Sequence, residues 1–198
     1  MPIPASTATA GSIASASLPW ERLTASEKRD RTLAVAGELF AREGIGLPMP
    51  ALAEALGVGV GSIYRQVGRK DDVIAALVIA RATILRERFL AAVATAGDPW
   101  QALVAATHAT VDDCLADAVT QTAWDEAAYA SEAVAAARAG ATEALAAMVG
   151  RARDAGLLAG DATHEDLRIL FCSLRELSPV GAPAAHRLAE LVLRGMRA

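Results

Sequence analysis

Three glycines alternate with valines in residues 56–65, LGVGVGSIYR, and a glycine-rich loop of this kind can bind a phosphate group. A dinucleotide-binding loop needs a strand before its first glycine and another glycine at the sixth position. The preceding residues, ALAEAL, instead have the composition of a helix, and the sixth position from Gly57 is Ser62. A P-loop must end in Gly-Lys-Ser/Thr, whereas Gly61 is followed by Ser62 and Ile63. The context therefore argues against both phosphate-binding loops.

The same stretch fits the turn and second helix of a helix-turn-helix. Gly57 can adopt the positive φ of such a turn without steric cost. Ile63 and Val67, four residues apart, would face the interior and leave the polar residues between them exposed. Because a recognition helix places its N-terminal side chains in the major groove, the stretch predicts a DNA-binding element.

A second group of residues that could bind a metal ion or take part in catalysis lies further along the chain. His108 and Asp112 are four residues apart on one helix face, a spacing that could hold a metal ion. The simpler interpretation is a His–Asp pair on the helix surface, since no third ligand follows at a fixed spacing. The sequence contains no G-x-S-x-G and no H-E-x-x-H motif. We expect no enzyme activity, no metal and no cofactor; a helical hydrolase or lyase using His108 and Asp112 is the enzymatic alternative.

The composition indicates an all-α protein. Of 198 residues 54% are hydrophobic but only 4% aromatic, and Ala and Leu dominate, as is typical of helices rather than strands. Cys114 and Cys172 lie within helical patterns and have no C-x-x-C partner, which fits a reducing compartment. No uncharged apolar run reaches the ~18 residues of a membrane span. We therefore expect a cytoplasmic protein with no membrane partner.

Capping signals define the first helices. Thr24 and Glu27 have the spacing of a capping box, and Gly44 follows as a stop signal. A short second helix is predicted over 48–56 and a third over about 59–67. Residues 1–23 are rich in Ser, Thr and Ala and are expected to form a disordered tail. The overall net charge is −4, yet residues 20–70 carry eight basic and six acidic side chains, a local excess of +2.

The remaining pattern is also helical. Asp71 and Asp72 begin a long helix, and Asp98 caps the next one. An Ala-rich helical region is expected to continue to about Arg153. Thr163 caps a further helix, and residues 179–183 separate it from the last helix of the chain.

The sequence RTLAVAGELFAREGIGLPMPALAEALGVGVGSIYRQVGRKDDVIAAL resembles the N-terminal domain of TetR-family transcriptional regulators. The motifs that carry the resemblance are AGELFAREG, LAEALGV, SIYRQV and KDDV, which follow one another without a gap. The resemblance implies a three-helix DNA-binding head over 24–70 and a helical ligand-binding and dimerisation body over 71–198. It further implies a homodimer that binds double-stranded DNA at a palindromic operator, as a repressor controlled by an unidentified small-molecule effector.

The alternative is a helical small-molecule-binding protein in which the helix-turn-helix is only a structural motif. The salt dependence of DNA binding distinguishes the two hypotheses, because a dimer that binds DNA phosphates loses affinity steeply between roughly 50 and 200 mM salt.

By resemblance, Tyr64 and Lys70 match residues that contact the phosphate backbone, which positions the head without reading sequence. Pro48 and Gly59 stand where the family often has a capping Ser or Thr, and Val60 can contact a thymine methyl group. For Arg65, a phosphate and a guanine remain open as partners. The predicted DNA-binding residues are Pro48, Met49, Gly59, Val60, Gly61, Ser62, Tyr64, Arg65, Gln66 and Lys70.

Two further sets are predicted in the body. Candidate effector-pocket residues are Trp100, His108, Cys114, Trp124, Tyr129, Met148 and Phe171. The last two helices resemble those that form the dimer interface in the family, and the resemblance implies as dimer-interface residues Leu167, Leu170, Phe171, Leu174, Leu188, Leu191 and Val192. Each of these residues could instead belong to an ordinary hydrophobic core, because apolar stripes at helical spacing usually face the interior.

Overall fold

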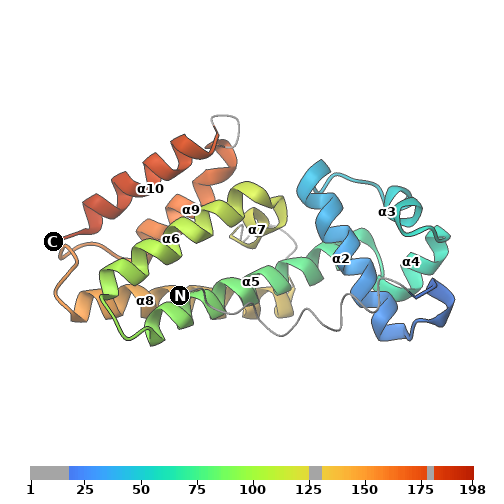
Figure 1. Cartoon of the computed structure of the whole chain (residues 1–198), viewed down its shortest axis with the longest axis horizontal. Helices are drawn as coiled ribbons and strands as arrows, with labels where there is room; N and C mark the ends of the chain where they lie inside the picture. Colours follow the sequence, from blue (N-terminus) through green and yellow to red (C-terminus); the bar gives the residue numbers. More distant parts are fainter. Residues whose placement is uncertain (1–17, 125–130, 178–180) are drawn as a thin grey trace.

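The computed structural model describes residues 18–124, 131–177 and 181–198 (Figure 1). The described elements, in chain order, are η1 (Trp20–Arg22), α2 (Ala25–Glu43), α3 (Met49–Leu56), α4 (Val60–Val67), α5 (Lys70–Ala94), α6 (Pro99–Ala116), α7 (Ala118–Ala123), α8 (Glu132–Asp154), α9 (His164–Leu177) and α10 (Ala182–Met196). Among the described residues the only β pairing is an isolated bridge between Leu158 and Arg197. The prediction of an all-α fold is confirmed.

A small head of α2, α3 and α4 lies at one end of the molecule, and the larger body lies at the other (Figure 1). The capping box that begins α2 is present: Thr24 N–H donates to Glu27 Oε2 at 2.8 Å, and Glu27 N–H donates to Thr24 Oγ1 at 3.3 Å. The hydrogen bond from the Thr24 backbone also lowers the pKa of Glu27. Gly44 ends α2 with a φ of 82°.

The head extends further toward the N-terminus than the predicted boundary at Thr24. Residues 18–23, which the sequence pattern assigns to the tail, include the helix η1, and Leu23 is buried. Arg31 Nη1 donates to the Leu18 carbonyl at 2.9 Å and fixes this segment to α2. The rest of the predicted tail, residues 1–17, lies outside the described residues.

The body is built on the pairing of two long helices, α5 and α8 (Figure 1). Small residues on α8, its alanines and Gly140, allow α5 and α8 to approach each other closely. A Cβ at Gly140 would lie 3.3 Å from Arg86 Cδ on α5. Three aromatic rings fill the interior beside this pair. The Trp124 ring lies 6.3 Å from Phe89 and 5.0 Å from Phe171, centroid to centroid. Burial of such large apolar side chains stabilises the fold by roughly 1.5–3 kcal/mol each.

The Ala-rich region, predicted to be helical to about Arg153, is divided into α6, α7 and α8, and α8 ends at Asp154. The helix α6 ends at Ala116, and Asp117 turns the chain into α7. The Asp117 side chain accepts from Val119 N–H at 2.8 Å and caps α7 in an extended conformation, with φ −142°. An aspartate that bonds to the backbone two residues ahead favours a new helix start over continuation.

The last two helices, α9 and α10, cover α6 (Figure 1). The C-terminus is fixed beside the α8–α9 connection, where Ala159 N–H donates to the Met196 carbonyl at 2.8 Å. Ala198 N–H donates to Leu157 in the same way, at 3.1 Å. Across the described part of the chain, no helix has both the length and the apolar character needed to span a membrane.

Candidate DNA-binding site

The helices α3 and α4 are joined by a tight turn at Gly57. Gly57 has a φ of 66° and a ψ of 32°, the left-handed conformation that glycine adopts most readily. Two backbone hydrogen bonds close the end of α3: Gly57 N–H donates to Glu54, and Val58 N–H donates to Ala53, each at 3.0 Å. These bonds satisfy carbonyls at the helix end and hold α4 at a fixed angle to α3. The geometry is that of a helix-turn-helix.

The side chains of α4 divide into a buried and an exposed set. Ile63 and Val67 are buried against the head, as their four-residue spacing predicts. On the other faces, Tyr64 is 47% exposed and Arg65 is also exposed, while Ser62 is half-buried. Arg65 Nη2 donates to Ser62 Oγ at 3.2 Å, so the two side chains form one polar unit on the helix surface.

The glycines at the start of α4 face open space. A Cβ placed on Gly59 or Gly61 would meet no heavy atom within 4 Å. Gly59 also has an ordinary backbone conformation, φ −69° and ψ 141°, and supplies no side-chain cap. Neither packing nor backbone strain within this chain therefore requires glycine at these two positions. The space around them is open to a molecule that approaches α4 from outside.

The helix ends beside α4 offer additional groups. Pro48 is exposed and precedes α3, and Lys70 is half-buried at the first position of α5. Gln66 is half-buried, and its carbonyl accepts from Arg29 Nη1 at 3.2 Å. Met49 differs from the prediction, because its side chain is only 6% exposed and belongs to the head core. Only its backbone N–H, at the start of α3, remains available to a ligand.

The predicted effector-pocket residues lie partly in the core and partly at the surface of the described residues. Trp100, Cys114, Met148 and Phe171 are buried core residues, and Tyr129 lies outside the described residues. The remaining two are Trp124, which lines a cavity of about 20 Å³, and His108, which is half-buried beside α10. The 20 Å³ cavity is too small for more than about one water molecule.

A larger hollow of about 360 Å³ lies among α5, α6 and α7. Two ion pairs occupy its wall: Arg81 Nε with Asp117 Oδ2 at 2.5 Å, and Arg88 Nη2 with Asp113 Oδ2 at 2.7 Å. Leu85 lines both this hollow and the small cavity beside Trp124. The sequence pattern missed the hollow because it selects large apolar residues, whereas charged side chains form much of this wall.

The predicted dimer-interface residues of α9 face their own chain. All four of them are buried within the single chain: Leu167, Leu170, Phe171 and Leu174. On α10, Leu188 and Val192 are half-buried, and only Leu191 is strongly exposed, at 50%. The apolar side chain that α9 presents to solvent is Ile169, which is 62% exposed. Ile169, Leu191 and Val192 line one groove of about 370 Å³ between the two helices.

Comparison with family models identifies both parts of this architecture. Residues 33–77 match the model described as bacterial regulatory proteins of the tetR family. Residues 88–198, more than half of the chain, match the C-terminal domain of SbtR-like transcriptional regulators. The chain belongs to the TetR family of transcriptional regulators. The expectation of a DNA-binding regulator is thereby confirmed.

Solved structures of TetR-family proteins share the fold over nearly their full length. A TetR regulatory protein from Mycobacterium vanbaalenii is 25% identical, with 88% of this chain and 97% of that chain covered and a TM-score of 0.61. A TetR transcriptional regulator from Streptomyces coelicolor is 26% identical, covering 85% and 98%, with a TM-score of 0.60. PfmR from Thermus thermophilus is 22% identical, covers 84% and 98%, and has a TM-score of 0.64. No curated protein matches the sequence.

For a TetR-family head, the structure adds a cation that the sequence pattern did not select. Arg69 is exposed directly before Lys70, and its backbone N–H is fixed by Asp72 Oδ2 at 2.7 Å. Arg69 could have been selected from the sequence because it directly precedes Lys70, a predicted DNA-binding residue. Gly68, with a φ of 80°, makes the sharp bend that places this pair beside the end of α4.

Proposed function

We propose that this TetR-family regulator is a ligand-responsive repressor that binds a palindromic operator as a homodimer. The observation that carries the proposal is the start of α4, where Gly59 and Gly61 leave open space around an exposed backbone. A helix without side chains at these positions can bring its backbone closer to the DNA. Val60, between them, is exposed and can contact a thymine methyl group.

The polar contacts of the proposed interface divide by role. Tyr64 and Lys70 contact phosphates and set the orientation of the head, while Ser62 and Arg65 act as one hydrogen-bonded unit toward a base edge or a phosphate. The remaining groups with access to the groove or the flanking phosphates are Pro48, the Met49 backbone, Gln66 and Arg69.

The proposed dimer interface is the groove side of α9 and α10. Ile169 and Leu191 are two large apolar side chains exposed together on the body. Apolar surface of this kind favours a partner that removes it from water. A second copy of this chain, related by a two-fold axis, would place two heads on two symmetric half-sites.

The proposed effector site is the hollow lined by Arg81 and Arg88. It lies against α5, the helix that begins at Lys70 in the head, so a ligand held there contacts the element that carries the head. The paired charges of the wall suit an effector with a polar group as well as an apolar part. Such a ligand shifts the protein toward the conformation that it binds more tightly, by no more than the difference in affinity.

Footprinting on the DNA that flanks its own gene tests the proposal. Protection of two symmetric half-sites, with an affinity that falls steeply between roughly 50 and 200 mM salt, is the expected result. Absence of any protected palindrome at moderate salt, with and without cell extract, would instead favour a helical small-molecule-binding protein that does not bind DNA.

A further inference from the structure

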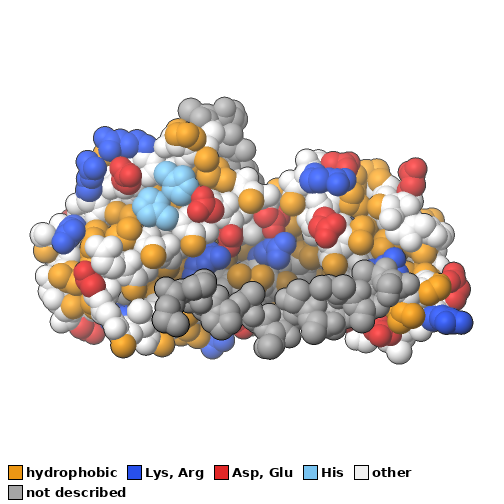
Figure 2. Space-filling view, viewed as in Figure 1, with side chains coloured by type: hydrophobic (Ala, Val, Ile, Leu, Met, Phe, Trp, Pro, Cys, Tyr) orange, Lys and Arg blue, Asp and Glu red, His pale blue; other side chains and the backbone are white. Residues whose placement is uncertain are grey.

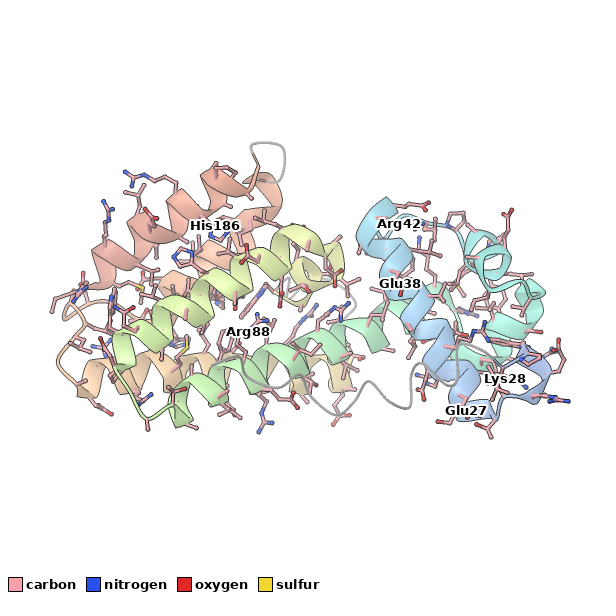
Figure 3. All side chains as sticks on the ribbon, in the orientation of Figure 1. Glu27, Lys28, Glu38, Arg42, Arg88 and His186 are labelled. Carbon is pink, nitrogen blue, oxygen red and sulfur yellow. The ribbon has the colours of Figure 1, made fainter. Side chains whose placement is uncertain are left out.

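Two histidines that are 78 residues apart in the sequence meet on the surface of the body. The rings of His108 in α6 and His186 in α10 have centroids 5.1 Å apart and an interplanar angle of 29°. Their Nδ1 atoms face each other at 2.9 Å. Figure 2 shows the two imidazoles side by side at the surface, and Figure 3 labels His186 between α10 and α6.

The proton positions of this pair follow from Asp112. His186 Nε2 lies 2.8 Å from Asp112 Oδ1, and an ionised carboxylate can only accept a hydrogen bond. His186 Nε2 must therefore carry a proton, which leaves the Nδ1 of the neutral ring as a lone pair. That lone pair points at His108 Nδ1. If His108 Nδ1 carries a proton, it donates a hydrogen bond to this lone pair. If it does not, a cation can bind to the lone pairs of both Nδ1 atoms.

We propose that His108 and His186 bind a divalent transition-metal ion of the zinc class through their two Nδ1 atoms. Two nitrogen ligands at Zn–N distances of 2.0–2.1 Å in a tetrahedral site lie about 3.3 Å apart. The observed 2.9 Å must open by roughly 0.4 Å, and both rings must rotate to turn their lone pairs from each other toward the ion. His108 then carries its proton on Nε2, and both lone pairs converge on the ion.

Asp112 has a positioning role in this site. A metal-binding histidine commonly donates its second ring N–H to a carboxylate, which fixes the tautomer and the ring orientation. His186 and Asp112 have this relationship. The described residues contain no group of three side chains arranged to hold a metal, so water completes the coordination. The His186 side chain is 31% exposed, which gives the ion and its waters access.

The donor set also limits the class of ion. Imidazole nitrogen suits Zn²⁺, Cu²⁺ and Ni²⁺, whereas Mg²⁺ and Ca²⁺ prefer oxygen ligands. The site joins α6 to α10 and shares no residue with the lining of the hollow proposed for the effector, and its test requires neither the effector nor DNA.

Calorimetric titration of the full chain with Zn²⁺, after removal of any affinity tag and bound metal, tests the proposal. We expect one Zn²⁺ per chain, no comparable heat with Mg²⁺, and an association constant at least about tenfold lower in His108→Ala and in His186→Ala. Asp112→Asn should lower the association constant by about tenfold while keeping the stoichiometry. His164→Ala is the matched control, since His164 is 32% exposed and lies 3.3 Å from the Glu165 carboxylate.

A second measurement needs no variant. Nitrogen NMR of the imidazoles reports which ring nitrogen binds the metal, and Nδ1 coordination in two histidines is expected. The proposal is overturned if Zn²⁺ leaves both Nδ1 signals unchanged, or if the wild-type chain and the His108→Ala, His186→Ala and His164→Ala variants all bind Zn²⁺ equally.

Discussion

Arg81 in α5 donates from Nε to Asp117 Oδ2 at 2.5 Å, and this same carboxylate caps α7. One aspartate therefore joins α5 to the corner where α6 ends and α7 begins. Asp117 Oδ1 accepts from Val119 N–H, and Oδ2 also accepts from the Thr120 hydroxyl. The Asp117 side chain is 11% exposed and the Arg81 side chain 33%, and loss of the carboxylate removes both the ion pair and the helix cap.

Asp117→Ala should lower the free energy of unfolding by about 2–4 kcal/mol, because it removes a helix cap and leaves the Arg81 guanidinium unpaired. Urea denaturation followed by circular dichroism measures the loss. Asp98→Ala is the matched control, since Asp98 caps α6 through Trp100 N–H but is exposed, and it should cost only about 1 kcal/mol. Equal losses for the two variants would show that the ion pair contributes nothing beyond the cap.

Lys70→Ala should weaken DNA binding equally for specific and unrelated sequences. It should also reduce the slope of log affinity against log salt by about 1 per chain. Arg65→Ala distinguishes the two open partners: loss of a phosphate contact behaves like Lys70→Ala, whereas loss of a guanine contact costs about 1–3 kcal/mol at one base position only. Arg42→Ala is the control, because Arg42 lies in the last turn of α2, outside the predicted DNA-binding residues, and pairs with Glu43 at 3.2 Å (Figure 3). A salt slope unchanged by Lys70→Ala would remove that residue from the interface.

Gly59→Ser should stabilise the head by a few tenths of a kcal/mol, since serine supplies the missing cap to α4 and its Cβ meets no neighbour. The same substitution should weaken operator binding if the open space there admits DNA. Gly57→Ser is the comparison, because its φ of 66° makes any side chain unfavourable, by about 1 kcal/mol or more. Thermal unfolding separates the two variants, and a head destabilised by Gly59→Ser would contradict the assigned cap position.

Ile169→Asp and Leu191→Asp should each raise the dimer dissociation constant about 100-fold or more, because both place an unpaired charge in the proposed interface. Sedimentation analysis measures the change. Leu90→Asp is the control: Leu90 is also exposed, but on α5, on the other side of the body (Figure 1). If only Leu90→Asp separates the chains, the interface lies on α5 instead.

Cys114 should resist thiol reagents until the protein unfolds. Its burial raises the pKa of the thiol to about 12, so at pH 8 the folded protein holds it fully protonated and shielded. The Cys172→Ser variant leaves Cys114 as the remaining thiol, and absorbance on reaction with a disulfide reagent follows it. We expect labelling in denaturant but no appreciable labelling under native conditions; rapid native labelling would contradict the buried position.

The head was predictable because local signals define it. Thr24 and Glu27 form the capping box that their spacing indicates, and Gly44 and Gly57 adopt the positive φ values expected of stop signals. The burial of the Met49 side chain was not predictable, because its place at the start of a helix does not reveal which way the side chain points. Each correct prediction depends on residues within a few positions of one another, where backbone chemistry decides the outcome.

The body was less predictable because its contacts join distant segments. Helical periodicity groups Leu167 with Leu174, but it does not say that this face packs inside the chain while Ile169 remains exposed. Likewise, the spacing of His108 and Asp112 suggests that these two residues pair. In the structure both instead contact His186, which approaches from α10. His186 could not be predicted as their partner, because no local sequence rule connects α6 to α10.

The helix α5 runs unbroken for 25 residues, from Lys70 beside the recognition helix to Ala94 at the far end of the body. Its length is about 37 Å at 1.5 Å per residue. A rod of that length acts as a lever: a tilt of about 5° at its body end would move its head end by roughly 3 Å. In the proposed dimer the two half-sites of the operator would be separated by a fixed helical repeat, so a displacement of that size in each chain would move the two heads out of register with them.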